Sequence, residues 1–149
     1  MNFAQELHSR FPQLTGAVQA ASAEQTTIAL TGPDVRPIAE YLRAECRCRL
    51  VTVFAEDRTP LDGFFYNYYV FEQPGDPCYL ILQAPIRGDE PHFPSLAAEL
   101  PAVNWQEREI QDWFGLARMA LMAGSASNSS ATKTRTVSRF QPLGWANSR

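Results

Sequence analysis

The strongest fold signal in this sequence is an aromatic run, Phe64-Phe65-Tyr66-Asn67-Tyr68-Tyr69-Val70-Phe71, followed by a Pro74-Gly75-Asp76-Pro77 turn and a second apolar segment, Cys78–Ala84. Aromatic and β-branched residues favour strands, and closely spaced Pro and Gly residues favour a tight turn. The two segments are therefore predicted to be neighbouring strands. Aromatic side chains fall on both faces of the first, so we expect it to lie centrally in a sheet with helices on one side.

A third strand is predicted directly upstream of this pair. Leu50–Ala55 is β-branched and alternating, and Pro60–Gly63 forms a turn before the aromatic run. A parallel crossover needs about a dozen residues or more, and the joining segments are shorter than that. The three strands are therefore expected to form an antiparallel meander.

The remaining N-terminal sequence predicts helices and short strands around this meander. Apolar residues at helical spacing predict a first helix over residues 2–12, and Asp34 is a suitable N-cap for a second helix over 35–46. Two short strands are expected at Ala17–Ala20 and Thr26–Leu30. The fold class is α+β, with a mostly antiparallel sheet of about four to five strands backed by helices.

The charge is divided unevenly along the 149 residues. Residues 1–117 hold all 16 acidic and eight basic side chains, a net charge of −8, whereas residues 118–149 hold five basic and no acidic ones, a net charge of +5. We predict one folded domain over 1–117 and a low-complexity, disordered basic tail over 118–149. An acidic body argues against nucleic-acid binding by the fold, because phosphate contacts need clustered Lys and Arg.

Membrane-spanning and secreted classes are not indicated. The longest apolar runs, Tyr68–Phe71 and Tyr79–Leu82, are far shorter than the roughly 18 residues of a membrane span. The N-terminal sequence has neither a basic leader nor an apolar core. Three cysteines cannot all pair with one another, so reduced thiols in a cytoplasmic compartment are expected.

Signatures of catalysis and of metal or cofactor binding are missing from the sequence. No G-x-S-x-G, GxGxxG or Walker A motif occurs, and the two histidines, His8 and His92, are too few for a histidine-rich metal site. Cys46-Arg47-Cys48 has only Cys78 to complete a zinc or iron–sulfur site, so we interpret the pair as one buried and one exposed thiol. We expect no catalytic, metal or cofactor site, and a surface role for His92.

A helix is predicted over Asn104–Phe114, after a Pro-rich connection with a helical turn near Ser95–Leu100. Asn104 is placed to cap it, Glu107 stands at the third helical position as in a capping box, and Gly115 is at the expected stop. On a helical projection the apolar side chains cover about half of the circumference, with Glu109 inside their arc. These apolar residues are Trp105, Ile110, Trp113, Phe114 and Leu116.

Glu109 is the candidate functional carboxylate of this helix, because burying a carboxylate is costly without a partner. Three interpretations are open: an anchor within the chain, to Arg43 or Arg87; a contact to another subunit through an aromatic patch; and a catalytic acid or base. Arg108 is placed for an i,i+4 ion pair with Asp112.

The same region carries a family resemblance. The segment is Pro101-Ala102-Val103-Asn104-Trp105-Gln106-Glu107-Arg108-Glu109-Ile110-Gln111-Asp112-Trp113-Phe114-Gly115. It closely resembles the signature of the respiratory-chain NADH dehydrogenase 30-kDa subunit family, with a Pro-Ala-Asn-Trp lead, Glu-Arg-Glu, an Asp and an aromatic-Phe-Gly close. Tyr69-Val70-Phe71-Glu72 and Phe93-Pro94-Ser95 agree more weakly. Glu109-Ile110-Gln111-Asp112 most resembles the version in membrane-bound nickel–iron hydrogenases of the formate hydrogenlyase type.

The resemblance covers about residues 1–117 and implies a domain without flavin, nickel or iron–sulfur centre. It implies a cofactor-free accessory or assembly subunit of a membrane-associated electron-transfer complex, either a hydrogenase or an NADH:quinone oxidoreductase. Such a subunit docks on the large subunit (nickel–iron hydrogenase-like or 49-kDa-like) at the cytoplasmic face and reaches the membrane only through the complex. The implied signature or interface residues are Trp105, Glu107, Arg108, Glu109, Asp112, Trp113, Phe114 and Gly115.

The sequence after Gly115 departs from the family pattern. The family continues with Gly-His-Pro, paired arginines and a Pro-Leu-Arg-Lys-like stretch, whereas Leu116–Arg149 contains no His and no acidic residue. We hypothesise that this end is unrelated sequence read from an altered frame, or a lineage-specific disordered end. Two alternative functions stay open: a stand-alone small-molecule binding module with a pocket among Phe64–Phe71, and binding of an anionic polymer or membrane through Arg118–Arg149.

Overall fold

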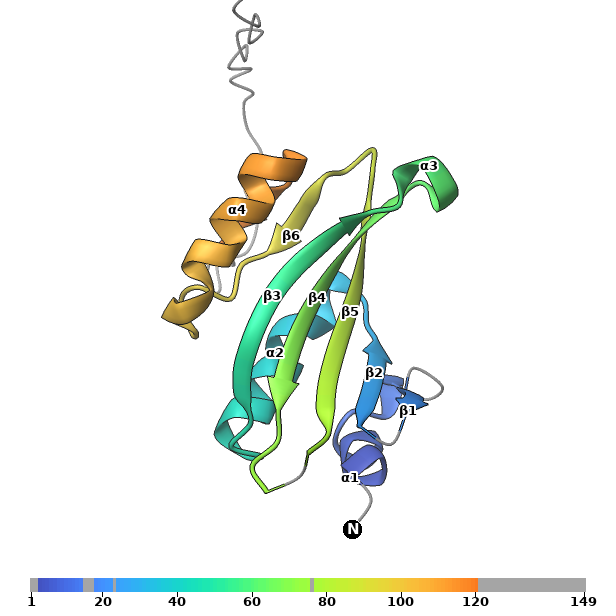
Figure 1. Ribbon diagram of the computed structural model, residues 1–149, viewed down its shortest axis with the longest axis vertical. Helices are drawn as coiled ribbons and strands as arrows, with labels where there is room; N and C mark the ends of the chain where they lie inside the picture. The colour runs from blue at the N-terminus through green and yellow to red at the C-terminus, as the bar shows by residue number, and fades with distance from the viewer. Residues whose placement is uncertain (1–2, 15–17, 23, 76, 121–149) are drawn as a thin grey trace, which may run out of the picture.

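The computed structural model describes residues 3–14, 18–22, 24–75 and 77–120 of the chain. These residues form a five-stranded sheet, a two-stranded sheet and helices around them (Figure 1). The helices are α1 (Phe3–Arg10), α2 (Gly32–Ala44), α3 (Thr59–Asp62) and α4 (Asn104–Phe114), with 3-10 turns at Pro12–Leu14 and Pro101–Val103. The strands are β1 (Val18–Ser22), β2 (Gln25–Ala29), β3 (Arg49–Asp57), β4 (Phe64–Glu72), β5 (Tyr79–Arg87), β6 (His92–Pro94) and β7 (Ala117–Met119).

The larger sheet has the strand order β1-β2-β5-β4-β3, and every pairing is antiparallel except the parallel pair β2–β5. The predicted antiparallel meander is confirmed as β3–β4–β5, and the α+β class is confirmed with it. The aromatic strand β4 is an inner strand between β3 and β5, while β5 takes the middle position. The parallel pairing could not be predicted from local sequence patterns, because α2, β3 and β4 lie between β2 and β5 along the chain.

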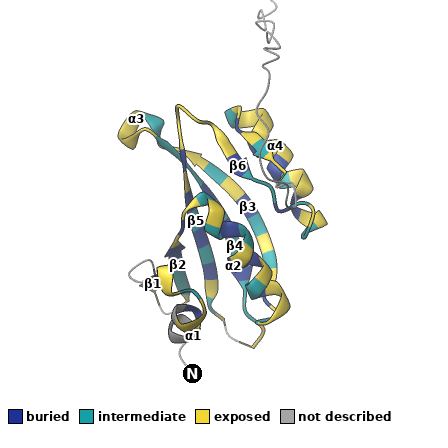
Figure 2. Cartoon of the chain, turned by 180° about the vertical axis from the view of Figure 1, so that it is seen from behind, coloured by how far each residue is buried: buried dark blue, intermediate teal, exposed yellow. Residues whose placement is uncertain are grey.

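Alternate residues of the inner strands face opposite sides of this sheet. Val53, Tyr69 and Leu82 pair across β3, β4 and β5, and all three side chains are buried. The neighbouring pair, Phe54 and Tyr68, faces the other side, where Phe54 is exposed and Tyr68 is half-buried. Figure 2 shows α2 lying across the first face of the sheet. A helix, α2, thus covers one face of the sheet that contains the aromatic strand, as predicted.

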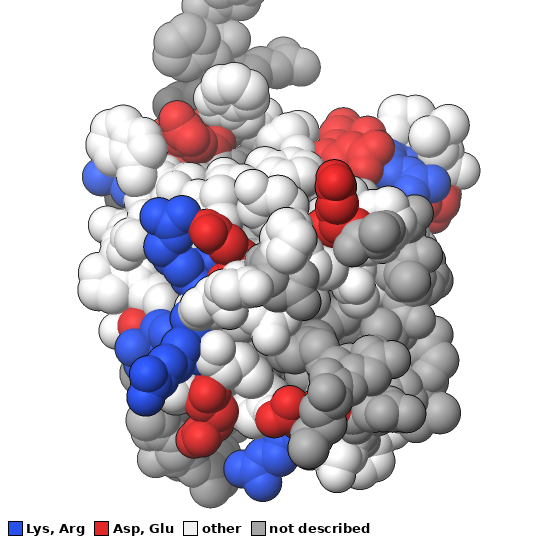
Figure 3. All heavy atoms as spheres, turned by 60° about the horizontal axis from the view of Figure 1, so that its bottom comes forward, with Lys and Arg blue, Asp and Glu red and all other residues white. Residues whose placement is uncertain are grey.

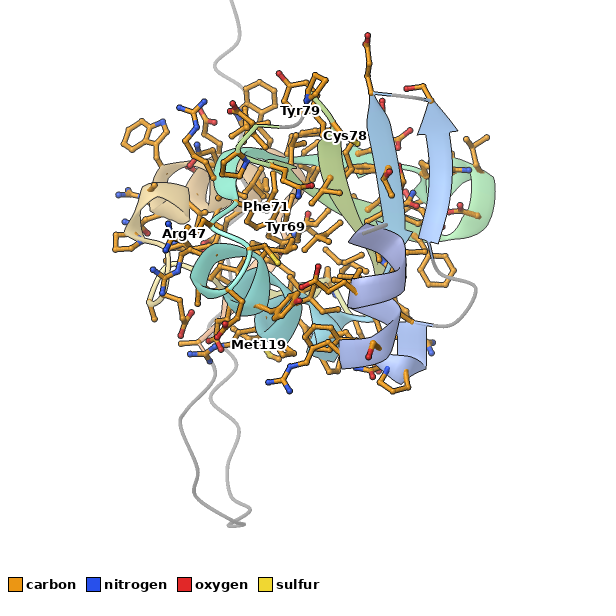
Figure 4. All side chains as sticks on the ribbon, turned by 90° about the horizontal axis from the view of Figure 1, so that it is seen from below. Arg47, Tyr69, Phe71, Cys78, Tyr79 and Met119 are labelled. Atoms are coloured by element: carbon orange, nitrogen blue, oxygen red, sulfur yellow. The ribbon has the colours of Figure 1, made fainter. Side chains whose placement is uncertain are left out.

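The hydrophobic core fills the space between this face and α2. Tyr69 and Phe71 are fully buried and, seen from below, lie between the sheet and α2 (Figure 4). The side chains of α2 that meet them recur at helical spacing, which gives the helix one apolar face. Those buried residues are Val35, Ile38, Ala39 and Leu42.

The start of α2 differs from the sequence prediction. The helix begins at Gly32 with Thr31 as its N-cap, so Asp34 lies in the first turn and is not the cap. The Asp34 carboxylate accepts a hydrogen bond from the Thr31 hydroxyl instead. Pro33, which lacks an N–H and fits the first turn of a helix, explains the earlier start. The helix ends at Ala44, two residues before the predicted end.

The two cysteines that follow α2 have different environments. Cys48 is buried and Cys46 is half-buried. Arg47 between them adopts a φ of 55°, a left-handed conformation that is unusual outside glycine. Burial raises the pKa of the Cys48 thiol to about 11, so the thiol is protonated at neutral pH.

The sequence pattern missed the second, two-stranded sheet. β6 and β7 run parallel, with His92, Phe93 and Pro94 opposite Ala117, Arg118 and Met119. Strands of three residues are too short for a periodic signal, and Leu116–Ala123 has a helical composition. Arg118 and Met119, assigned by charge to the tail, thus lie in a strand. The predicted disordered tail otherwise falls on residues 121–149, which lie outside the described residues.

Two buried residues of β4, Asn67 and Tyr69, place polar groups on the face of the sheet that is packed against the core. Asn67 is fully buried between Ala55 and Ala84 of the adjacent strands, and neither polar atom of its amide has a hydrogen-bond partner among the described residues. The hydroxyl of Tyr69, on the same face, is also buried without a well-formed hydrogen bond to another described residue. Burial raises its pKa, and the nearby Asn67 side chain acts against that rise. An unpaired buried polar group costs about 1–3 kcal/mol of stability.

Replacing Asn67 with valine should therefore stabilise the protein. Asn67→Val removes both unpaired atoms and introduces a residue favoured in strands, so the free energy of unfolding should rise by about 1 kcal/mol or more. Urea denaturation measures this change, and Tyr69→Phe, which removes the neighbouring hydroxyl, is expected to be neutral or stabilising. A loss of stability in Asn67→Val would instead reveal an internal partner for the amide.

Candidate partner-binding site

Helix α4 packs against the β3 edge of the sheet through a narrow apolar face. Ile110 of the helix and the flanking residues Val103 and Leu116 are buried, and the ring of Phe114 meets that of Phe65 edge-on with centroids 6.1 Å apart. In Figure 1 the helix lies beside β3 on the side away from β5. Part of the exposed side of α4 therefore lies next to the outer edge of β3.

The buried carboxylate of this helix is Glu107, which is fully inaccessible to solvent. The Ser95 hydroxyl donates a hydrogen bond to Oε2 at 2.6 Å, and the backbone N–H of Leu96 donates to Oε1 at 2.7 Å. Nη1 of Arg118 lies 4.0 Å from Oε2. Burial raises the pKa of Glu107, and these hydrogen bonds act against that rise. Glu107 thus joins α4 to the segment after β6 and is not part of a capping box.

The ends of α4 only partly match the sequence prediction. Gly115 ends the helix, as predicted: its φ is 69°, and its N–H donates to the Gln111 carbonyl at 2.9 Å. Asn104 is not the cap, because the 3-10 turn before it runs directly into the helix with Val103 at the N-cap. The Asn104 side-chain oxygen instead accepts a hydrogen bond from Arg118 Nη1 at 2.9 Å.

Glu109 is exposed, so of its three interpretations the structure does not support that of an anchor within the chain. Among the described residues it forms no ion pair, and Arg87 pairs with Asp89 at 2.6 Å instead. The helical projection placed Glu109 on the buried side because it counted both tryptophans as buried. The side of α4 that faces the core instead carries Glu107, Ile110 and Phe114.

The predicted ion pair between Arg108 and Asp112 is also not formed. The Arg108 guanidinium carbon lies over the ring of Trp105, 5.9 Å from its centroid, a cation–π geometry. Both tryptophans of α4 point into solvent, with Trp105 68% and Trp113 80% exposed. We call the exposed side of the helix the α4 surface, made of Trp105, Arg108, Glu109, Asp112 and Trp113.

A groove of about 180 Å³ separates the α4 surface from the edge of β3. Its base is apolar, and its helix side carries the carboxamide of Gln106 and the carboxylate of Glu109. The lining residues are Val53, Phe54, Ala55, Gln106, Glu109, Ile110, Trp113 and Phe114. Three of the eight, Glu109, Trp113 and Phe114, are among the implied interface residues, and the β3 residues could not be assigned without knowing that α4 lies beside β3.

Other candidate sites are poorly supported by the described residues. Over residues 3–14, 18–22, 24–75 and 77–120, no group of three or more His, Cys, Asp and Glu side chains could hold a metal ion. His92 is exposed on β6. In Figure 3, blue arginines and red acidic side chains are interspersed on one face of the domain. No helix within these ranges combines the length and apolarity needed to cross a membrane.

Comparison with known proteins agrees with the resemblance of the α4 segment. The family model for the respiratory-chain NADH dehydrogenase 30-kDa subunit matches residues 28–118, so the chain belongs to that family. Over 116 residues, 77% of this chain, it is 29% identical to Hydrogenase-4 component G and 26% identical to Formate hydrogenlyase subunit 5, both of Escherichia coli (strain K12). The predicted likeness to the hydrogenase form is thereby confirmed.

The matched region is a small part of these relatives. It covers 21% of Hydrogenase-4 component G and 20% of Formate hydrogenlyase subunit 5, so the chain spans about a fifth of their length. A chain in the structure of the membrane-bound sulfane sulfur reductase (MBS), an archaeal respiratory membrane complex, has the same fold. Its TM-score is 0.67 at 14% identity, over 77% of this chain and 67% of that one.

Mutation of the two glutamates at 107 and 109 of α4 should change stability by very different amounts. Glu107→Ala leaves the buried Leu96 N–H unpaired and opens a cavity, so we expect the free energy of unfolding to fall by about 3 kcal/mol. Glu109→Ala, two residues away but exposed, should change it by less than about 0.5 kcal/mol. Urea denaturation of the two variants checks this, and equal losses would contradict the assignment of Glu107 as the anchor.

The raised pKa of Glu107 also predicts the sign of a pH effect. The folded protein binds a proton at Glu107 more tightly than the unfolded chain, so this group's stabilising contribution is present at low pH. It is lost as the pH rises from the ordinary glutamate pKa through the raised one. Relative to Glu107→Gln, the wild-type protein should lose stability over that interval, measured by urea denaturation at a series of pH values.

Proposed function

We propose that this chain is an accessory subunit of a membrane-associated electron-transfer complex and docks on the redox-active large subunit through the α4 surface. The hydrogenase type is preferred over the NADH:quinone type, because both Escherichia coli relatives carry hydrogenase or formate hydrogenlyase names. In this role the domain is structural: it covers and positions a surface of the large subunit. It lies on the cytoplasmic side and reaches the membrane through the complex.

The observation that carries this proposal is the exposure of Trp105 and Trp113 on one short helix. Large aromatic side chains are costly to leave in water and are enriched in the binding hot spots of protein interfaces. Glu109 stands beside Trp113 without an ion pair among the described residues, so a charged group is available to a partner. Glu107 holds the helix in place from below, which presents these side chains on a fixed support.

Small-molecule binding has weaker support from the geometry. The predicted pocket among Phe64–Phe71 is not the groove beside α4, which β4 does not line. The first two aromatics of β4 border a separate, open hollow with Gly63, Arg87 and Gly88. Asn67, Tyr69 and Phe71 of the strand are buried in the core, and on the other face Tyr68 stacks on Phe54 of β3 with ring centroids 4.9 Å apart.

Docking through the α4 surface predicts a specific loss of capture. When the chain is co-expressed with the cognate hydrogenase large subunit, Trp113→Ala or Glu109→Ala should weaken recovery of the complex about tenfold, equivalent to about 1.4 kcal/mol. Affinity pull-down with quantitative blotting measures this recovery. Because both residues are exposed, the thermal unfolding of the isolated variants should match that of the wild type.

Leu61→Ala is the matched control. Leu61 is 79% exposed, like Trp113, but lies on α3 at a distance from α4 (Figure 1). It should leave capture unchanged. Equal capture by all three folded variants would rule out the α4 surface as the docking site.

A further inference from the structure

The groove between α4 and β3 combines an apolar floor with acceptor oxygens on one wall. Val53 and Ala55 of β3 and Ile110 of α4 contribute to the floor, and Gln106 and Glu109 stand along the helix. Gln106, Glu109, Ile110 and Trp113 are spaced by three and four residues, so they form one continuous stripe of the helix. The groove thus results from the packing of α4 beside the edge strand β3.

The side-chain oxygens of Gln106 and Glu109 accept no hydrogen bond or ion pair from the described residues. Oε1 of Gln106 is buried and has no hydrogen-bond partner, and the Glu109 carboxylate forms no ion pair, among the described residues. No lysine or arginine in the described part of the chain lines the groove. The exposed Glu109 carboxylate is therefore available to an occupant that carries positive charge and donates hydrogen bonds.

The remaining walls are aromatic. The side chain of Trp113 is 80% exposed and that of Phe54 is 46% exposed, one on each side of the groove. Aromatic faces attract cations, and planar guanidinium groups stack on them better than ammonium groups do. A volume of about 180 Å³ suits a single large side chain, because a protein cavity of about 150 Å³ holds one benzene molecule.

We propose that the groove receives an arginine side chain of the partner protein, whose guanidinium stacks on Trp113 and donates hydrogen bonds to the Glu109 carboxylate. This inference rests on the proposed docking through the α4 surface and specifies the chemistry of the partner there. The net charge of −8 over residues 1–117 complements a basic partner surface. Arginine is preferred over lysine because its fork of donors can bind both oxygens of the Glu109 carboxylate while its plane lies on the indole.

The direct test uses N-acetyl-L-arginine amide as the probe, added to the ¹⁵N-labelled full chain. Signals of the Trp113 indole N–H and the Gln106 side-chain amide should shift saturably, with a dissociation constant in the millimolar range (about −4 kcal/mol). N-acetyl-L-citrulline amide, which has the same shape without the charge, should bind about tenfold more weakly or worse, and the lysine amide about threefold more weakly. Equal binding of the arginine and citrulline probes overturns the proposal.

Charge-matched variants separate the groove from general electrostatics. Glu109→Gln should weaken arginine amide binding about fivefold, whereas Glu24→Gln, an exposed residue at the β1–β2 turn, should leave it unchanged. If Glu24→Gln weakens binding as much as Glu109→Gln does, the attraction is non-specific and the proposal fails. Absence of a saturable shift at Trp113 up to about 100 mM probe also overturns it.

Competition in the complex distinguishes this inference from the docking proposal. Arginine amide should release the large subunit from the captured chain, and citrulline amide should not. If Trp113→Ala abolishes capture but arginine amide neither binds nor competes, the docking proposal stands and the arginine inference fails. If capture survives Trp113→Ala while arginine amide binds saturably, docking through the α4 surface fails and the guanidinium assignment of the groove is supported.

Discussion

The buried carboxylate of Glu107 is the interaction on which the candidate site depends. It has no access to water, so its two hydrogen bonds to Ser95 and Leu96 must compensate for the lost hydration. Those bonds fix the rotation of α4 about its own axis. With Glu107, Ile110 and Phe114 turned inward, the tryptophans and Glu109 necessarily face solvent.

The same alternation of inward and outward positions explains where the groove lies. β3 is an edge strand, so its outer side has no neighbouring strand among the described residues, and α4 packs along it. Phe54 faces the open side of the sheet while Val53 and Ala55 face the core, which places aromatic and aliphatic side chains around one edge. An unpaired sheet edge is commonly covered in this way, and the groove is the space left between the two surfaces.

Much of the fold could be predicted because its signals are local. The β3–β4–β5 meander follows from short connections and aromatic strands, and Gly115 ends α4 where the sequence indicates. The parallel β2–β5 pair could not be predicted, because it joins segments far apart in the sequence. In α4 the helix projection placed Glu109 on the buried side, whereas the buried glutamate is Glu107. Only the partners of Glu107 at Ser95 and Leu96, which lie outside the helix, make its burial favourable.

The small β6–β7 sheet has a consequence for how α4 is held. Pro91 accepts a hydrogen bond from the Ala117 N–H, and the Ser95 N–H donates to Met119, so the chain around α4 forms a loop closed at its base by its own backbone. This loop does not share strands with the five-stranded sheet. It is nevertheless joined to that sheet by its side chains, because Phe93, Leu96 and Leu116 are buried in the same hydrophobic core. Hydrogen exchange over residues 91–119 would therefore report how firmly this loop is held to the shared core, and a molecule that bridges α4 and β3 should slow that exchange.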